Sequence, residues 1–420
     1  MKKKIFDSKY YKIALSVATA LALFFATVAV ILYAKGYRLQ SGGILGSTGQ
    51  LVLKSNPDAA SVFINGKFVA ATNSTLNLSP GEYTVKIVKD GYSPWEKKLK
   101  IESEVVTPTD AVLFPSVPEL RRFTTTGAIN PVVSLDQTKI AYGVASSSAY
   151  PPNNGIYISD ISDRQIMFGS SGTQLVVRDA PAAQFSTGKF LFSPDSKQLL
   201  VYFESEMGSE NTENQKKMGI DLSQVIAAYL IDTTKSVNGE DVPDVSLTLD
   251  QTLDNWEKEK KQEETNQFNI LKKEVKKIAS SSMEIISFTV DESKFMFRAK
   301  ENVELLIIVK PRLIGTNSTP ENRNLKKGNL YIYDIKEDKN YEIQNPGALF
   351  PTWLATSRHY ITVEDNKIFV TEYDGTNKTM VYSGPFEKSF VVPSASGARI
   401  LFLTSLSSDL PLNLYGLLIR

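Results

Sequence analysis

The chain of 420 residues contains no cysteine and one histidine, His359. The absence of cysteine excludes disulfides, thiol nucleophiles and thiolate metal ligands. The single histidine excludes a His-Glu-x-x-His site, and neither a P-loop nor a Gly-x-Ser-x-Gly run occurs. His359 follows Ser357 and Arg358 in a turn-like stretch, where a polar turn residue is a simpler interpretation than a catalytic base. We therefore expect no catalytic, cofactor-binding or metal-binding residues, and a protein that is not an enzyme.

An excess of charge of either sign is also missing, because 47 basic residues face 46 acidic ones. Five lysines and one aspartate precede residue 13, which leaves 42 basic and 45 acidic residues after it. Nucleic-acid binding needs a cationic face that displaces counterions from phosphates. The slightly acidic main part of the chain argues against a nucleic-acid partner.

One long uncharged run, residues 13–34, stands near the start of the sequence. Its 22 residues, held as a helix, are long enough to cross the hydrocarbon core of a bilayer, which is about 30 Å thick. The tail of residues 1–12 holds five lysines against Lys35 and Arg38 after the run, so the positive-inside rule places the tail in the cytoplasm and the remainder outside. We expect a single-pass protein of the cell membrane, with this run as its only membrane contact.

A cleaved secretory signal is the alternative to a membrane anchor. The apolar core of such a signal is usually about 7–15 residues and ends at small residues. The present run is longer and closes with Ile31-Leu32-Tyr33, which favours an uncleaved signal-anchor. Residues 35–49 follow as a Gly- and Ser-rich linker with little apolar surface to bury.

Residues 50–114 consist of short β-type runs separated by turn residues, which predicts a small β-sandwich. Asn65-Gly66 between two apolar runs is a strong two-residue hairpin signal, and Pro80-Gly81 marks a second turn. Residues 83–88 alternate as a half-buried strand does.

The same stretch resembles a PEGA domain in successive blocks: residues 55–62, Asn65-Gly66, residues 78–85 and Gly91-Tyr92. The signature tetrapeptide maps onto Pro57-Asp58-Ala59-Ala60, with Asp for Glu and Ala for Gly. The alanine at the glycine position disfavours a positive φ there. The resemblance implies a small β-sandwich of cell-surface and envelope proteins without catalytic residues.

Trp95 and Tyr92 are the candidate binding surface of this module. Glycan binding requires exposed aromatic rings. Trp95 follows Gly91-Tyr92, where it either caps the core of the sandwich or stands exposed, and the sequence leaves both alternatives open.

Residues 107–119 are rich in proline, which predicts an extended, stiff connection to the next module. That module, residues 115–420, carries an internal repeat. Each of five copies has a polar turn, an apolar strand and a second strand with a central aromatic. The turn anchors are Asp136, Asp195, Asp291, Thr356 and Ser396, and the aromatics are Tyr157, Tyr229, Tyr331, Phe369 and Tyr415. We expect the acids to bond turn amides rather than a metal, and the aromatics to form core rather than a carbohydrate platform.

The copy around Phe192-Ser193-Pro194-Asp195 resembles the repeat of TolB-type β-propellers, which implies a propeller of five or six blades but no particular function. The last copy lacks an outer strand, while residues 119–126 are an unassigned strand-like segment. We expect these two to pair and close the ring, because closure removes an exposed edge.

Residues 252–280 interrupt the repeat with seven lysines and six acids, and apolar residues recur at helical intervals from Phe268 to Ile278. This pattern predicts a helical insertion whose charged face is solvated, with pairs such as Glu257 and Lys261.

The fold class predicted from these features is mainly β: an N-terminal transmembrane helix, a PEGA-like sandwich and a propeller with a helical insertion. The leading functional hypothesis is an anchored, extracytoplasmic binding or scaffolding protein whose partner is an envelope protein or a cell-wall glycan. An anchored glycan or peptide hydrolase or lyase, and a purely structural surface component, are the alternatives.

Overall fold

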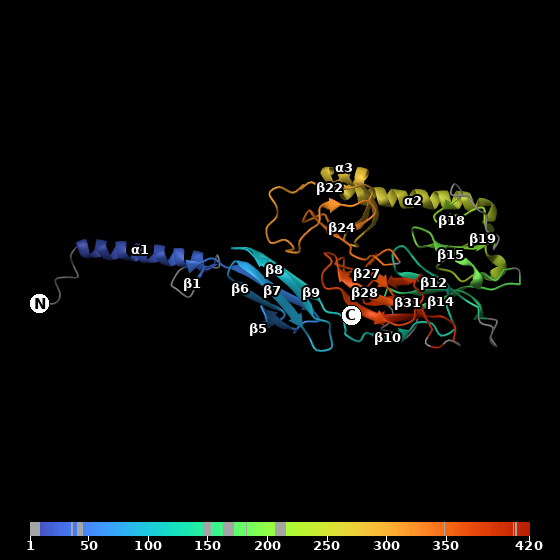
Figure 1. Cartoon of the computed structure of the whole chain (residues 1–420), viewed down its shortest axis with the longest axis horizontal. Helices are drawn as coiled ribbons and strands as arrows, with labels where there is room; N and C mark the ends of the chain where they lie inside the picture. The colour runs from blue at the N-terminus through green and yellow to red at the C-terminus, as the bar shows by residue number, and fades with distance from the viewer. Residues whose placement is uncertain are drawn as a thin grey trace. The chain divides into compact units, whose positions relative to one another are not determined.

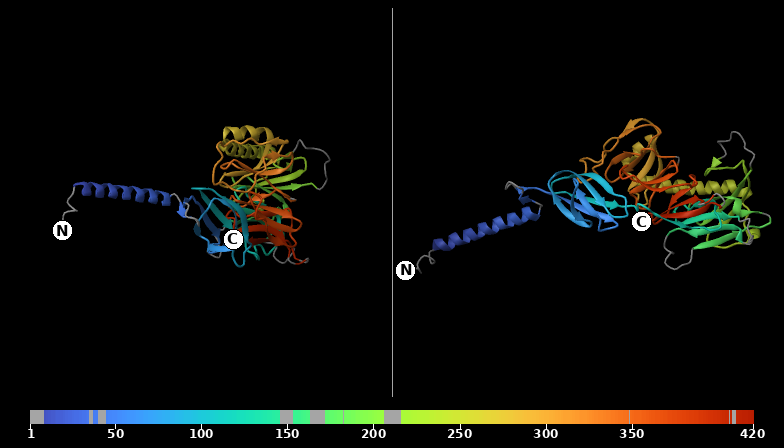
Figure 2. Two further views of the ribbon diagram at one scale, coloured as in Figure 1. Left: turned by 60° about the vertical axis from the view of Figure 1, so that its left-hand side comes forward. Right: turned by 60° about the horizontal axis from the view of Figure 1, so that its bottom comes forward.

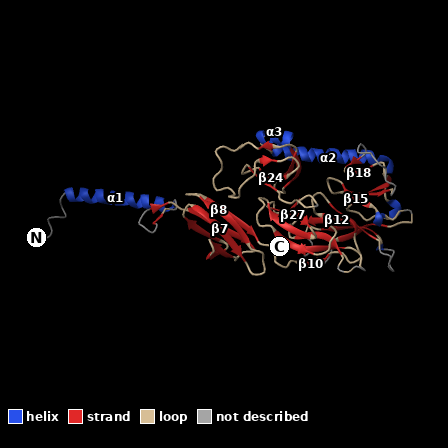
Figure 3. Cartoon of the chain, viewed as in Figure 1, coloured by secondary structure: helices blue, strands red, loops and turns tan. Residues whose placement is uncertain are grey.

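The computed structural model describes residues 9–34, 37–39, 45–145, 153–162, 172–181, 183–205, 216–347, 349–405, 407 and 410–420. The chain forms two compact units and is mainly β (Figures 1 and 3). Unit 1 comprises Met1–Leu113 together with Val309–Pro320, and unit 2 comprises Phe114–Ile308 and Glu321–Arg420. Residues 1–8 of the predicted basic tail and residues 35, 36 and 40–44 of the predicted linker lie outside the described residues.

Helix α1, Lys9–Ala34, contains the predicted uncharged run. Within it, Tyr11–Tyr33 has a mean hydropathy of 2.5, and none of its most apolar stretch is buried. Its length and composition suffice for crossing a membrane, and a signal sequence has the same properties. After α1, the short strands β1 (Arg38–Leu39) and β2 (Leu45–Gly46) pair antiparallel, so that Arg38 lies opposite Gly46.

The rest of the first unit is a two-sheet sandwich around one apolar core, shown from two further sides in Figure 2. One sheet has the order β6-β3-β9 and the other β5-β4-β7-β8. The strands are β3 (Gly49–Asn56), β4 (Ser61–Ile64), β5 (Lys67–Ala71), β6 (Ser74–Leu78), β7 (Gly81–Val88), β8 (Trp95–Ile101) and β9 (Val106–Val112). The predicted hairpin is confirmed, because Asn65 and Gly66 join β4 to β5 with φ of 49° and 80°.

Strand β9 refines the prediction of an extended, stiff connection over residues 107–119, because the first part of that stretch is a strand of the sandwich. It pairs in parallel with β3, and Pro108 lies opposite Val52. A proline is tolerated here because β9 is an edge strand, whose outer side needs no ladder donor. Thr107, Thr109 and Ala111 alternate inward and are buried, so the strand completes the core of the sandwich.

The described part of unit 2 contains five antiparallel sheets of three or four strands. The sequence predicts a propeller of either five or six blades. The first sheet consists of β11 (Ile129–Val133), β12 (Lys139–Val144), β13 (Gly155–Asp160) and β14 (Thr173–Arg178), and the second of β15 (Lys189–Phe192), β16 (Gln198–Glu204) and β19 (Val225–Asp232). The third sheet consists of β20 (Met283–Phe288), β21 (Lys294–Ala299), β24 (Leu330–Asp334) and β25 (Lys339–Glu342). The fourth consists of β26 (Thr352–Trp353), β27 (His359–Glu364), β28 (Lys367–Glu372) and β29 (Thr379–Ser383).

The fifth sheet closes the ring as predicted. It has the order β10-β32-β31-β30, with β10 (Glu119–Arg122), β30 (Val391–Pro393), β31 (Arg399–Thr404) and β32 (Asn413–Leu418). Strand β10 pairs antiparallel with β32, and Glu119 lies opposite Leu418. One apolar cluster then joins this sheet to the first sheet through Leu401, Leu414, Ile140 and Tyr142.

All five predicted turns join the first and second strands of a sheet with one geometry. The amide of the residue that opens the turn bonds the carbonyl five residues later at 2.9 Å, as Ser193 does to Gln198. The residue at the bend has positive φ in each copy: Gln137, Ser196, Glu292, Ser357 and Gly397. As expected, Asp136, Asp195 and Asp291 each accept a turn amide at 3.1 Å. A hydrogen bond from the Ser193 hydroxyl, followed by the one from the Lys197 amide, lowers the pKa of Asp195.

The predicted insertion consists of α2 (Leu249–Ile270) and α3 (Lys273–Ser282), drawn in yellow in Figure 1. The first half of α2 buries Leu253 and Trp256 against β16 and β19. Phe268 near its end and Val275 of α3 pack with β21 and β24. The insertion thus links the second and third sheets, and Glu257 and Lys261 form the expected surface ion pair at 3.7 Å.

The remaining elements of unit 2 are short. They are the strand pairs β17 (Lys216–Lys217) with β18 (Ile220–Asp221) and β22 (Val303–Glu304) with β23 (Asn324–Leu325), and three 3-10 turns at Phe185–Thr187, Gly239–Asp241 and Ser246–Thr248.

Candidate functional site

A cavity of about 720 Å³ lies in unit 2 where three first strands begin. Ile129 opens β11, Lys189 opens β15 and Phe390 directly precedes β30, and all three residues line the cavity. The shared turns lie at the other end of these strands, so the cavity opens on the opposite face. A volume in this range is typical of small-molecule and cofactor pockets.

The lining combines apolar walls with a few polar groups at the rim. Phe190, Phe390 and Leu403 form buried walls, and Leu412 is 43% exposed. The other lining residues are Thr126, Gly127, Ala128, Ile129, Asn130, Pro131, Val132, Ala145, Lys189, Tyr202, Glu387, Ser389 and Pro411. Such a lining suits a ligand with an apolar body and polar edges.

The polar rim groups already have protein partners. Lys189 pairs with Glu204. Glu387 accepts the Ser389 hydroxyl at 3.0 Å, and the Asn130 side-chain amide donates to the Gly188 carbonyl at 2.9 Å. Burial, followed by the charge of Glu204, raises the pKa of Tyr202, so this phenol stays neutral. The rim therefore offers positioned hydrogen-bonding groups rather than an activated base.

One wall of the cavity is built by ring closure. The segment that follows β10 contributes Thr126–Ala128, and the segment before β32 contributes Pro411 and Leu412. The amide of Ala128 bonds the Leu412 carbonyl at 2.9 Å. Buried Asn413 accepts the Gly127 amide at 3.0 Å. The cavity and the closing strand are thus one structural feature, and sequence analysis gave no direct signal for the cavity because its walls come from distant segments.

Among the described residues no group of three His, Asp or Glu side chains is placed to hold a metal ion. His359 opens β27 directly after the predicted turn, and its carbonyl accepts the turn hydrogen bond from the Leu354 amide at 2.9 Å. The residue is buried, with 1% exposure. Its ring packs edge-on against Phe114 at 5.3 Å, and its Nδ1 lies 3.2 Å from the Thr356 hydroxyl.

Of the two residues of the predicted binding surface, Trp95 lies in the core of the sandwich with 3% exposure. Tyr92 packs against the same core and is half-buried. Of the two alternatives left open by the sequence, Trp95 is therefore part of the core and is not exposed, because its ring faces inward at the start of β8. Glycan binding at this surface stays a prediction that depends on the exposed part of Tyr92.

The repeated aromatics of unit 2 are partly core, as expected. Tyr331 and Tyr415 are buried, while Tyr157, Tyr229 and Phe369 are half-buried. The rings of Tyr157 and Tyr142 stack with their centroids 5.9 Å apart, and Lys378 Nζ lies 4.5 Å from the centroid of the Phe369 ring. They do not form a continuous exposed platform.

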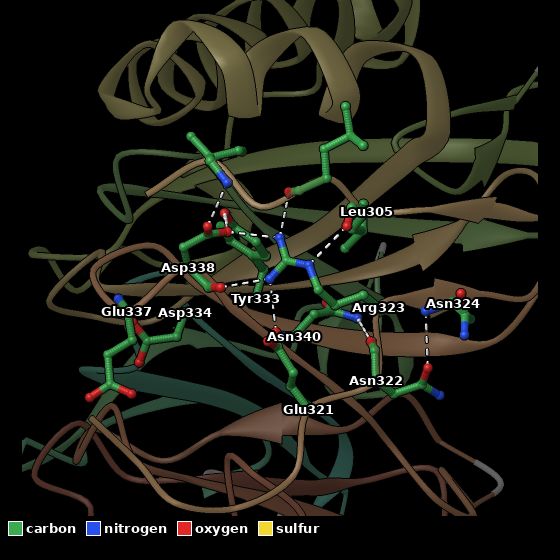
Figure 4. Close-up of polar contacts among 12 residues, drawn as sticks. Leu305, Glu321, Asn322, Arg323, Asn324, Tyr333, Asp334, Glu337, Asp338 and Asn340 are labelled. Atoms are coloured by element: carbon green, nitrogen blue, oxygen red, sulfur yellow. Dashed lines mark hydrogen bonds and ion pairs between the residues drawn. The ribbon is translucent and has the colours of Figure 1, made fainter. Parts of the chain in front are cut away.

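A second polar feature, the Arg323 network, joins the chain on both sides of residues 309–320 (Figure 4). Arg323 donates to the carbonyls of Leu305 and Asp338 at 2.8 and 2.7 Å, to Glu321 at 2.8 Å and to the Asp338 carboxylate at 2.9 Å. Asp338 also accepts the Ile308 amide at 2.7 Å.

The charges of the Arg323 network are matched internally. Burial alone would lower the pKa of Arg323, but the hydrogen bonds to Asp338 and Glu321 outweigh burial and raise it. Burial, together with the bond to Asp338, raises the pKa of Tyr333. The network therefore fixes Ile308 and Glu321, the two residues between which the 309–320 segment leaves and re-enters unit 2.

The strand order and core of the sandwich can now be compared with known families. Residues 48–116 match the family model of the PEGA domain. The sandwich is a PEGA domain. The predicted resemblance is confirmed with one correction: Ala59, at the glycine position of the signature, has a φ of 52°. The positive φ of the turn is therefore present in this PEGA domain without glycine.

No curated protein sequence matches the chain. Solved structures similar to it include TolB from Acinetobacter baumannii (13% identity, 80% of this chain and 59% of that chain, TM-score 0.21). A putative TolB from Agrobacterium tumefaciens matches at 12% identity over 70% and 72% of the two chains, TM-score 0.21. An oligogalacturonate lyase from Vibrio parahaemolyticus matches at 8% identity over 81% and 86%, TM-score 0.26.

Proposed function

We propose that the chain is a single-pass, membrane-anchored binding protein of the cell envelope. In this account α1 spans the membrane, the lysine-rich tail stays in the cytoplasm, and the PEGA domain and propeller lie outside. The apolar length of α1 and the excess of lysine before it support this topology. The PEGA domain supports an envelope location.

The observation that carries the binding role is the cavity of about 720 Å³ beside the closing strand. Its walls are apolar, its rim groups are paired, and its position depends on closure of the ring. We propose that it binds an exposed segment of an envelope protein or of cell-wall glycan, and that the PEGA domain and anchor hold it near the membrane.

Photo-crosslinking from the cavity tests the binding role, because a chain without native cysteine can carry one label at a chosen position. Leu412→Cys places the label on the exposed part of the cavity wall. Leu247→Cys is the matched control, since Leu247 is fully exposed in the same unit and does not line the cavity. Both labelled chains are irradiated in intact cells.

The proposal predicts one predominant protein or glycan adduct from position 412 and not from position 247. Leu412→Arg should reduce co-sedimentation with the captured partner, while Leu247→Arg should not. Equal, non-specific adducts from both positions would contradict a ligand in the cavity. Cleavage of the captured partner by the wild-type chain would favour the hydrolase or lyase alternative instead.

A further inference from the structure

Residues 309–320 leave unit 2 and pack on the PEGA domain as part of unit 1. The amide of Lys100 donates to the Ser318 hydroxyl at 2.9 Å. A Cβ at Gly315, whose φ is 69°, would lie 2.8 Å from Val105 Cγ1 and 3.2 Å from the Val106 carbonyl oxygen. The segment therefore lies against the turn between β8 and β9, and its closest approach requires glycine.

That turn lies at the proximal end of the PEGA domain, the end at which β3 begins. Glu104 donates its amide to the Thr48 carbonyl at 3.1 Å, and Gln50 donates to the Val105 carbonyl at 2.9 Å. The first residues of the domain and the part of the 309–320 segment around Gly315 thus lie at the same end of the sandwich. The opposite end, with Asp90, lies about 23 Å away along an eight-residue strand.

The proximal end is also tied closely to α1. Arg38 follows Ala34 by only four positions, and Arg38 lies opposite Gly46 across the β1–β2 pair. Three more residues lead to Gly49. At about 3.5 Å per residue and about 5 Å across the pair, the proximal end lies within roughly 30 Å of the end of α1.

The surface of the 309–320 segment is apolar and basic. Leu313 is 45% exposed and Ile314 is 72% exposed, and Val106 of the neighbouring strand is 52% exposed. Lys310 is exposed two residues before half-buried Arg312 in the same segment. Exposed apolar side chains flanked by cations are the composition that binds the headgroup and upper acyl region of a bilayer with anionic lipids.

We infer that Leu313, Ile314 and Lys310 form a second, peripheral contact with the leaflet at which α1 ends. The inference rests on the proposed anchor, and it would add a second membrane contact to the single one expected from the sequence. The tether length places the proximal end within reach of the surface, and the charge of the segment matches anionic headgroups. The contact would hold the PEGA domain against the bilayer rather than on a free stalk.

Fluorescence quenching of the full chain in lipid nanodiscs tests this contact. The chain carries one environment-sensitive fluorophore on Ile314→Cys, on Asp90→Cys at the distal end of the same unit, or on Leu21→Cys inside α1. The nanodiscs contain phosphatidylcholine with or without phosphatidylglycerol, and quenchers are carried on lipid or dissolved in water. Position 314 should lose most of its fluorescence to the lipid quencher, more so with phosphatidylglycerol, while position 90 should respond only to the aqueous quencher.

Quenching at 21 together with water-like behaviour at 314 in both lipids would overturn the peripheral contact and leave the anchor intact. Absence of lipid quenching at 21 would overturn the anchor and the contact together. Protection of 314 from both quenchers would overturn the lipid contact in favour of a protein covering the segment.

Discussion

Thr124 and Asn413 lie 289 residues apart in the sequence and are joined by a hydrogen bond of 3.1 Å between Thr124 Oγ1 and Asn413 Oδ1. The Leu414 amide donates to the same threonine oxygen at 2.9 Å. Both side chains are about 5% exposed or less, so these bonds are shielded from water. They fix the segment that follows the closing strand and forms one wall of the cavity.

Removing either partner should loosen this closure. Thr124→Val and Asn413→Ala each leave buried polar groups without partners, so each should lower the free energy of unfolding by about 1–3 kcal/mol. Thr124→Ser keeps the hydroxyl and is the matched control. Urea unfolding and limited proteolysis of residues 119–128 measure the effect; a Thr124→Val chain as stable as Thr124→Ser would disprove the role of the bond.

Gly143 of β12 approaches the 3-10 turn Phe185–Thr187 too closely for any side chain. A Cβ there would lie 1.8 Å from the Ser186 carbonyl oxygen. Gly143→Ala must therefore push the backbone of residues 185–187 away, and it should cost about 3 kcal/mol or more. Gly416→Ala, where the nearest atom would lie at 3.4 Å, should cost much less. Thermal unfolding of the two variants gives the comparison, and equal midpoints would contradict the packing described.

Ala59 holds a positive φ that glycine adopts without strain. Ala59→Gly should raise the stability of the PEGA domain by up to about 1 kcal/mol, because the relief of strain of about 1–2 kcal/mol exceeds the entropy cost of glycine. Ala60→Gly is the control, since Ala60 is fully buried and loses a core methyl. It should destabilise the domain. Hydrogen exchange of the β3 and β4 amides reports both changes, and a destabilising Ala59→Gly would refute the strain argument.

The repeat could be predicted because local residues specify each turn. The ring closure could be predicted because the last copy lacks an outer strand and an unassigned strand-like segment precedes the first copy. Asp195 and its counterparts satisfy their own turn amides, so each hairpin carries its signal in a few residues. Strand β9 was missed because Pro108 resembles a break, although its alternating threonines were a usable signal. The cavity, the Arg323 network and the packing of Gly315 on Val105 depend on contacts between segments far apart in sequence, which no local pattern encodes.

Tyr341 and Tyr333 are two buried tyrosines whose hydroxyl groups differ in hydrogen bonding. The Tyr341 hydroxyl is buried without a hydrogen-bond partner among the described residues, whereas the Tyr333 hydroxyl donates to Asp338 at 2.7 Å. At pH 7, Tyr341→Phe should change the free energy of unfolding by less than about 0.5 kcal/mol or increase it, while Tyr333→Phe should lower it by about 1–3 kcal/mol. Similar losses in both variants would contradict this contrast.

The pH dependence has a definite sign. Burial raises the pKa of Tyr341, and burial with the Asp338 bond raises the pKa of Tyr333. The folded state therefore keeps protons that the unfolded chain releases above about pH 10. This contribution is fully present below pH 10 and is lost as the pH rises toward the raised pKa, so urea unfolding at pH 9 and pH 11 should show a drop that Tyr341→Phe reduces.

The central claim, that one anchor holds the PEGA domain and the propeller outside the cell, is tested most directly by cysteine accessibility. The cysteine-free chain is labelled in intact cells with a membrane-impermeant maleimide at Asp90→Cys or at Lys3→Cys. We predict labelling at position 90 in intact cells and at position 3 only after lysis, with both chains in the membrane fraction. Labelling at position 3 but not 90 in intact cells, or loss of position 3 from a secreted chain, would contradict the account.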